Sequence, residues 1–137
     1  MNNKHHFYFH HIEVKDSLVH GKGIFASIDI PEEETILLIE GDVIDGNECE
    51  RREEEENNVY IFWNGDDCYI DTNNSEKIKY VNHDCDPNCY VDEWDTSTLQ
   101  LVALRDIKAG EELTIDYGYE EIYENCNCHT CQAKKAV

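Results

Sequence analysis

The chain has 137 residues, of which 40% are hydrophobic and 31% are charged, and its formal net charge at neutral pH is -20. This length suits a single domain, and the sequence lacks an apolar run of about 18 residues that would predict a membrane-spanning helix. Such an acidic surface repels phosphate, which argues against direct nucleic-acid binding and favours a basic protein as partner; the same charge would also aid solubility.

Short apolar segments separated by turn residues fill the first third of the chain. Residues 12–14 predict a strand, and residues 35–39 predict a buried strand that follows a polar turn at residues 31–34. The Gly21-Lys22-Gly23 segment predicts a tight turn, in which glycine is favoured because it tolerates a positive φ. This pattern favours β structure at the start of the chain.

The middle of the chain is polar and then aromatic. Residues 45–58 are expected to hold one short helix, with the acidic run 53–56 on a solvated helix face or loop. Residues 59–63 predict a strand. The Asn64-Gly65 pair is a hairpin signal, so residues 68–71 are the expected partner strand.

Two more strands are predicted after residue 98. Residues 99–104 form the first, and a turn at residues 108–112 leads to the second at residues 113–115. The chain has only two prolines and no internal repeat or long helical pattern. Many short strands in one length of this size predict a mainly β single domain.

Seven cysteines are an odd number, so a disulfide framework cannot use all of them. The start of the chain has no signal-peptide pattern, which predicts an intracellular, reducing compartment and not a secreted protein. Cys126, Cys128 and Cys131 have a spacing typical of zinc ligands but are one short of the four that zinc prefers, and a flexible reduced tail is the alternative. Cys68 is expected in the core and Cys49 on the surface.

Two blocks near the C-terminus carry the strongest functional signal. Residues 82–89 read N-H-D-C-D-P-N-C, and residues 111–117 read E-E-L-T-I-D-Y. They resemble the N-H-S-C-x-P-N and G-E-E-L-T-x-D-Y signatures of SET-domain protein-lysine methyltransferases, with Asp84 in place of the usual serine. The resemblance extends over roughly residues 12–131, and the tail after residue 120 is similar to a post-SET segment.

The resemblance implies a fold that periodicity alone does not predict. This fold is mainly β, with small curved sheets, a threaded pseudoknot near the C-terminus and a short zinc-binding tail. Residues 1–120 would form the SET domain and residues 121–137 the post-SET segment. In such proteins the cysteine of the N-H-S-C block completes the zinc site, which gives the ligand set Cys85, Cys126, Cys128 and Cys131. His129 and Cys89 are alternative ligands.

The resemblance also implies the cofactor and the site. The methyl donor would be S-adenosylmethionine, and Tyr117 would be the catalytic residue, with its hydroxyl beside the transferred methyl group. The positions that match the family's cofactor contacts are Gly21, Lys22, Gly23, Tyr80, Asn82, His83 and Tyr117. The lysine channel would be lined by Ile115, Tyr119 and Tyr123.

Two positions depart from the family pattern. Ile39 stands where many members carry a channel tyrosine, and Ile115 stands where many carry phenylalanine or tyrosine. The residue at the second position influences how many methyl groups are added. Because Ile115 has no hydroxyl to hold a water molecule, the sequence favours more than one methyl group.

The expected function is therefore transfer of a methyl group from S-adenosylmethionine to a lysine of a basic protein, which a histone or another chromatin protein would satisfy. Two alternatives remain open from the sequence. One is a zinc-containing interaction module that has lost transfer, and the other is a methyltransferase for a non-chromatin protein such as a ribosomal protein. The expected location is intracellular, either cytoplasmic or chromatin-associated; no residue pattern predicts the oligomeric state.

Overall fold

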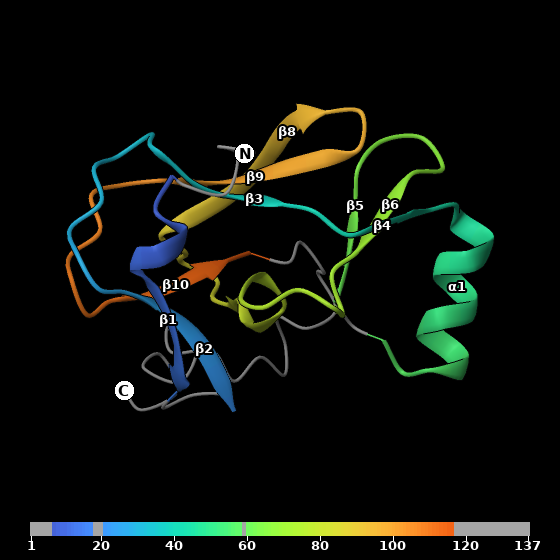
Figure 1. Cartoon of the computed structure of the whole chain (residues 1–137), viewed down its shortest axis with the longest axis horizontal. Coiled ribbons are helices and arrows are strands. Elements are labelled where there is room, and N and C mark those ends of the chain that lie inside the picture. The colour runs from blue at the N-terminus through green and yellow to red at the C-terminus, as the bar shows by residue number, and fades with distance from the viewer. Residues whose placement is uncertain (1–6, 18–20, 59, 117–137) are drawn as a thin grey trace.

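Three small β-sheets carry most of the fold (Figure 1). The computed structural model describes residues 7–17, 21–58 and 60–116. The first sheet has the order β1 (Ile12–Asp16), β2 (Lys22–Ala26), β10 (Glu112–Ile115) and β7 (Asn82–His83). The second has the order β3 (Thr35–Ile39), β9 (Thr98–Ala103) and β8 (Cys89–Asp95). The third has the order β4 (Asp42–Ile44), β6 (Tyr69–Asp71) and β5 (Ile61–Trp63).

Helical structure is limited to short elements within the described ranges. Helix α1 (Gly46–Glu55) lies at one end of the molecule beside the third sheet (Figure 1). Single 3-10 turns occur at η2 (Phe9–His11) and η3 (Ile78–Tyr80). None of the helices in this part of the chain is long and apolar enough to cross a membrane. The expectation of a mainly β fold with one short central helix is confirmed.

The core is built from branched aliphatic side chains that the strands direct inward. Ile24, Ile39 and Leu101 are essentially inaccessible to solvent, and each comes from a different strand. Burial of this kind supplies most of the stability of a small domain, at about 1.5–3 kcal/mol per large aliphatic side chain. Ile39, the position at which the family resemblance predicts a channel tyrosine, is therefore a packed core residue.

The strand β10 is inserted into the middle of the first sheet. It pairs antiparallel with β2 and parallel with β7, so it separates two strands that are some 60 residues apart in sequence. A parallel pair needs a long crossover connection, and residues between β7 and β10 provide it. The prediction of a threaded pseudoknot near the C-terminus concerns a region that lies partly outside the described residues.

Several sequence predictions need correction. Only Gly21 in the Gly-Lys-Gly segment has a positive φ, of 53°, because Lys22 and Gly23 already belong to β2. Cys49 was expected on the surface but is 6% exposed and is the one buried residue of α1. Cys68 was expected in the core but is only half-buried.

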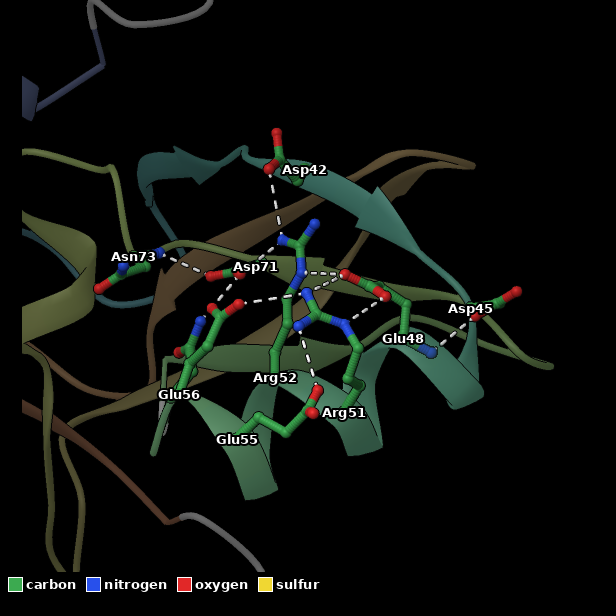
Figure 2. A network of polar contacts seen from close by, with 10 residues as sticks. Asp42, Asp45, Glu48, Arg51, Arg52, Glu55, Glu56, Asp71 and Asn73 are labelled. Carbon is green, nitrogen blue, oxygen red and sulfur yellow. Dashed lines mark hydrogen bonds and ion pairs between the residues drawn. The ribbon is translucent and has the colours of Figure 1, made fainter.

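Helix α1 is joined to the third sheet by a partly buried ion pair (Figure 2). Arg52 Nη1 donates to Asp71 Oδ2 at 2.7 Å, and the same oxygen accepts from Asn58 Nδ2 at 2.8 Å. The Asn73 N–H donates to the other Asp71 oxygen at 2.9 Å. Burial alone would raise the pKa of Asp71, but these hydrogen bonds outweigh burial and hold the pKa below its usual 3.8.

The charge on Asp71 makes the stability of this region depend on pH. Because the pKa is lower in the folded than in the unfolded state, the carboxylate stabilises the fold above pH 3.8, and this contribution is lost as the pH falls through the folded-state pKa. Asp71→Asn is expected to lower the free energy of unfolding by about 1–3 kcal/mol at neutral pH, and by less below about pH 4. Urea unfolding across this pH range measures both effects.

The matched control is Asp66→Asn, which removes the same charge from an exposed position. It should change the free energy of unfolding by no more than about 0.5 kcal/mol. A gap between wild type and Asp71→Asn that stays the same from pH 7 to pH 3 would contradict the role given to the Asp71 carboxylate.

Candidate functional site

The two signature blocks meet as neighbouring strands. In the parallel pair of β7 and β10, Asn82 lies opposite Thr114 and His83 lies opposite Ile115. The pairing continues one residue further, because the Asp84 N–H donates to the Ile115 carbonyl at 3.0 Å. The pair thereby holds side by side two segments that are about 30 residues apart in sequence. The second of these segments, β10, ends shortly before Tyr117 in the sequence.

Glu112 is the polar centre of this arrangement. Its Oε2 accepts from Asn82 Nδ2 at 2.8 Å, and its Oε1 accepts from Ser17 Oγ at 2.9 Å. The same Asn82 amide donates to the Lys22 carbonyl at 3.0 Å. Three segments that the family resemblance places at or next to one predicted cofactor pocket are therefore joined through one carboxylate and one amide.

The two glycines of this region are required for different reasons. Gly21 has a positive φ, and nothing would obstruct a side chain there, so backbone conformation alone favours glycine. A Cβ at Gly23 would overlap the Glu112 carboxylate and come within 3.1 Å of Asn82 Nδ2. The missing side chain at Gly23 thus makes room for the Glu112 carboxylate within the protein itself.

His83 and Asp84 show how the first block is shaped. The His83 side chain is 8% exposed, with Nδ1 at 3.8 Å from Asp116 Oδ1 and Nε2 at 3.4 Å from Cys85 Sγ. Asp84 Oδ1 accepts from the Asp86 N–H at 3.0 Å. A serine hydroxyl can make the same kind of local turn, so the departure from the family pattern at Asp84 keeps the turn while adding a carboxylate.

Asn88 connects the first block to β10 in a way that sequence reasoning missed. Its side chain is almost fully buried, with Nδ2 donating to the Glu112 carbonyl at 2.8 Å and Oδ1 accepting from the Thr114 N–H at 2.9 Å. One amide therefore satisfies two backbone groups of the strand that carries the second block. The only signal in the sequence was the position of Asn88 within the P-N pair of the motif.

The remaining predicted cofactor and channel residues lie in different environments. Tyr80 lies in η3, half-buried against the core, and Lys79 Nζ is 5.2 Å from the centre of its ring. Ile115 is 6% exposed and belongs to the core cluster. Lys22 is exposed, and its Nζ lies 3.1 Å from Asp16 Oδ1. The predicted residues Tyr117, Tyr119 and Tyr123 lie outside the described residues.

The predicted zinc site is only partly within the described residues. Cys85 is half-buried beside His83, whereas Cys126, Cys128, Cys131 and the alternative ligand His129 lie outside them. Within the described ranges, no group of three or more His, Cys, Asp or Glu side chains could hold a metal. Burial raises the pKa of the alternative ligand Cys89 to about 12, which opposes the thiolate form that zinc binds.

Comparison with known proteins gives a consistent match. The SET domain family model matches residues 21–118. The chain is 36% identical over 130 residues to histone-lysine N-methyltransferase ASHH3 of Arabidopsis thaliana, covering 85% of this chain and 36% of that protein. It is 34% identical over 130 residues to the variant-silencing SET domain-containing protein of Plasmodium falciparum, covering 85% of this chain and 5% of that protein.

A third relative matches over nearly the whole chain. Histone-lysine N-methyltransferase trithorax of Drosophila melanogaster is 30% identical over 138 residues, covering 93% of this chain and 4% of that protein. The chain thus spans about a third of the length of the Arabidopsis relative and a twentieth or less of the other two.

Proposed function

The chain belongs to the SET-domain family, and from this premise we propose that it is an S-adenosylmethionine-dependent protein-lysine N-methyltransferase that acts on a basic protein, a histone in particular. The observation that carries the proposal is the convergence of three motif segments on Glu112 and Asn82, on the strand that leads to Tyr117. The histone assignment draws on the names of the relatives and on the net charge of -20, which complements a lysine-rich substrate.

The residues at the site fit the proposed cofactor. Lys22 presents an exposed ammonium group beside Gly21, and a cofactor carboxylate is a suitable partner for it. Asn82 and His83 offer polar groups from the adjoining strand, with the asparagine amide fixed by Lys22 and Glu112. When bound, S-adenosylmethionine supplies a methyl group on a sulfonium, which is already a good leaving group.

The protein then has two tasks, which are to orient the lysine amine and to exclude water. The amine must be neutral to attack, and a desolvated channel lowers the pKa of lysine from about 10.4 in water.

Tyr117 is proposed to hold its hydroxyl at the transfer point, where the oxygen accepts a weak C–H hydrogen bond from the polarised methyl group. Tyr119 and Tyr123 are proposed to line the channel beside Ile115. Because Ile115 has no hydroxyl that could retain a water molecule in the channel, we expect the addition of more than one methyl group.

A structural zinc ion is proposed to fix the C-terminal tail, with Cys85, Cys126, Cys128 and Cys131 as ligands. The donor set fits zinc, which prefers four thiolate or imidazole ligands in a tetrahedron. Cys85 is half-buried next to the parallel strand pair, with its Sγ at 3.4 Å from His83 Nε2. A tail held there would complete the cofactor and lysine pockets.

Cys128→Ser is expected to reduce bound zinc from about one ion per chain to near zero, because three ligands hold a structural zinc ion poorly. Zinc content after dialysis, measured by mass spectrometry, tests this. The control is Cys68→Ser, which alters a half-buried thiol whose Sγ lies 3.8 Å from the Thr96 carbonyl. Full zinc retention in Cys128→Ser would mean that the ligand set is wrong.

The proposed activity is tested by transfer of radiolabelled methyl groups to a mixed set of histones and ribosomal proteins. Label on lysine in histones supports the proposal, and a chromatin location with it. Label only on ribosomal proteins would favour a non-chromatin substrate. Cofactor binding without label on any protein would favour the non-catalytic interaction module.

A further inference from the structure

A cavity of about 330 Å³ lies between helix α1 and the third sheet. From the helix it is lined by Gly46, Cys49, Glu50 and Glu53, and from the sheet by Ile61, Trp63 and Tyr69. These lining residues include none of the positions assigned to the cofactor, the lysine channel or the zinc site. The cavity is therefore a feature for which the proposed methyl transfer gives no role.

The two carboxylates of this cavity have no cationic partner among the described residues. Helix α1 carries two arginines, but both are already paired elsewhere (Figure 2). Arg51 contacts Glu48, Glu55 and Glu56, and Arg52 contacts Glu48, Asp42 and Asp71. Glu50 and Glu53 are one helical turn apart, and both are exposed and line the cavity. Their negative charges are therefore not neutralised by a cation from the described residues.

The Cys49 thiol lies at the buried side of the cavity, close to these carboxylates. Burial is the largest cause that raises the pKa of Cys49 to about 11, and the charges of Glu53, Asp71 and Glu50 and a hydrogen bond to Glu53 contribute in the same direction. A cation entering the cavity would experience the opposite effect and be stabilised.

The opposite wall of the cavity is aromatic. Trp63 is 67% exposed, the highest exposure among the large hydrophobic side chains in the described ranges, and Tyr69 is half-buried beside it. An exposed indole next to carboxylates that lack a cationic partner is poorly explained by packing. It is well suited to a planar cation, because a guanidinium group can stack on the ring while its N–H groups donate to carboxylates.

We propose that the cavity between α1 and β5–β6 binds the side chain of an arginine from a basic polypeptide, stacked on Trp63 and paired with Glu50 and Glu53. Arginine suits the site better than lysine because its guanidinium is planar, less strongly hydrated and able to engage two carboxylates at once. On the proposed function, this arginine would belong to the substrate protein and would select sequences that carry it near the target lysine.

The test uses nuclear magnetic resonance of the full chain with nitrogen-15 label, without S-adenosylmethionine. The chain has two tryptophans, and Trp94 packs edge-on against Phe7 at a centroid distance of 5.7 Å, which makes its indole an internal control. The probe is a blocked Gly-Ser peptide with one central arginine. We expect a saturable shift of the Trp63 indole signal and an unchanged Trp94 signal. The matched peptide with citrulline, which is neutral, should bind at least about 5-fold more weakly.

Substitutions test the carboxylate contact and the indole contact separately. Glu50→Gln and Glu53→Gln should each weaken arginine-peptide binding by about 2–5-fold, whereas Glu54→Gln, an exposed carboxylate of the same helix that does not line the cavity, should not change it. Trp63→Leu, followed through the Gly46 amide signal, should weaken binding by about 2–5-fold, and Trp94→Leu should not.

Three results would overturn the proposal. These are equal shifts for the arginine and citrulline peptides, equal effects of Glu50→Gln and Glu54→Gln, or tighter binding of a lysine or trimethyl-lysine peptide than of the arginine peptide. The measurement requires no methyl transfer, so its failure would leave the proposed enzymatic activity untouched. Loss of that activity would equally leave the arginine site testable.

Discussion

Tyr117→Phe is expected to reduce the rate of methyl transfer by about 10²-fold or more while leaving cofactor affinity within a few-fold of wild type. The change removes one oxygen, and the proposed role of that oxygen is to stabilise and orient the methyl group only during transfer. Groups aimed at the reacting centre are typically worth about 10²–10³ in turnover. The hydrogen bonds that join Glu112 to Asn82 and to Ser17 do not use the Tyr117 hydroxyl, so the fold should persist.

The measurement is single-turnover transfer of radiolabel to the best protein substrate, with cofactor binding followed by calorimetry. Tyr90→Phe is the matched control, since it removes a hydroxyl that donates to the exposed Glu33 carboxylate at 3.0 Å. It should leave the transfer rate within about 2-fold, as expected for a surface contact. A Tyr117→Phe enzyme as fast as the control would remove Tyr117 from the mechanism.

Local patterns predicted most of the strands because burial of one or both faces of a strand produces a recognisable pattern of apolar residues in the sequence. Residues 35–39 form a continuous aliphatic run, and they are buried along nearly the whole of β3. The short helix was also predictable, with Asp45 accepting from the Glu48 N–H at 2.8 Å as its cap. Strand β8 was missed because several of its residues are acidic and exposed, so its apolar signal is confined to one end.

The identity of the site residues was readable in the motifs, but their connections were not. Glu112 contacts Ser17 across 95 positions and Asn82 across 30, and no local pattern encodes such distances. The burial of Cys49 was missed for a related reason. The segment around it is polar, and only the packing of one helix face against the third sheet encloses the thiol.

The connection most sensitive to change is the buried amide of Asn88. Asn88→Ala would leave the Thr114 N–H and the Glu112 carbonyl without this partner in a nearly water-free environment. An unsatisfied buried group costs about 1–3 kcal/mol, so the free energy of unfolding should fall by about 2–5 kcal/mol. Urea unfolding of the variant measures the loss.

The loss of stability in Asn88→Ala should also be local, which distinguishes it from a general weakening of the core. Amide hydrogen exchange in β10 should accelerate more than exchange in the pair of β8 and β9, because Asn88 holds the backbone of β10. The control Asn64→Ala removes an exposed amide that donates to the Thr96 carbonyl at 3.4 Å, and it should cost no more than about 0.5 kcal/mol. Equal costs for the two substitutions would show that β10 is held by its strand partners alone. A selective loss would instead make Asn88 the link between strand order and the proposed transfer site, because β10 runs directly into Asp116 and Tyr117.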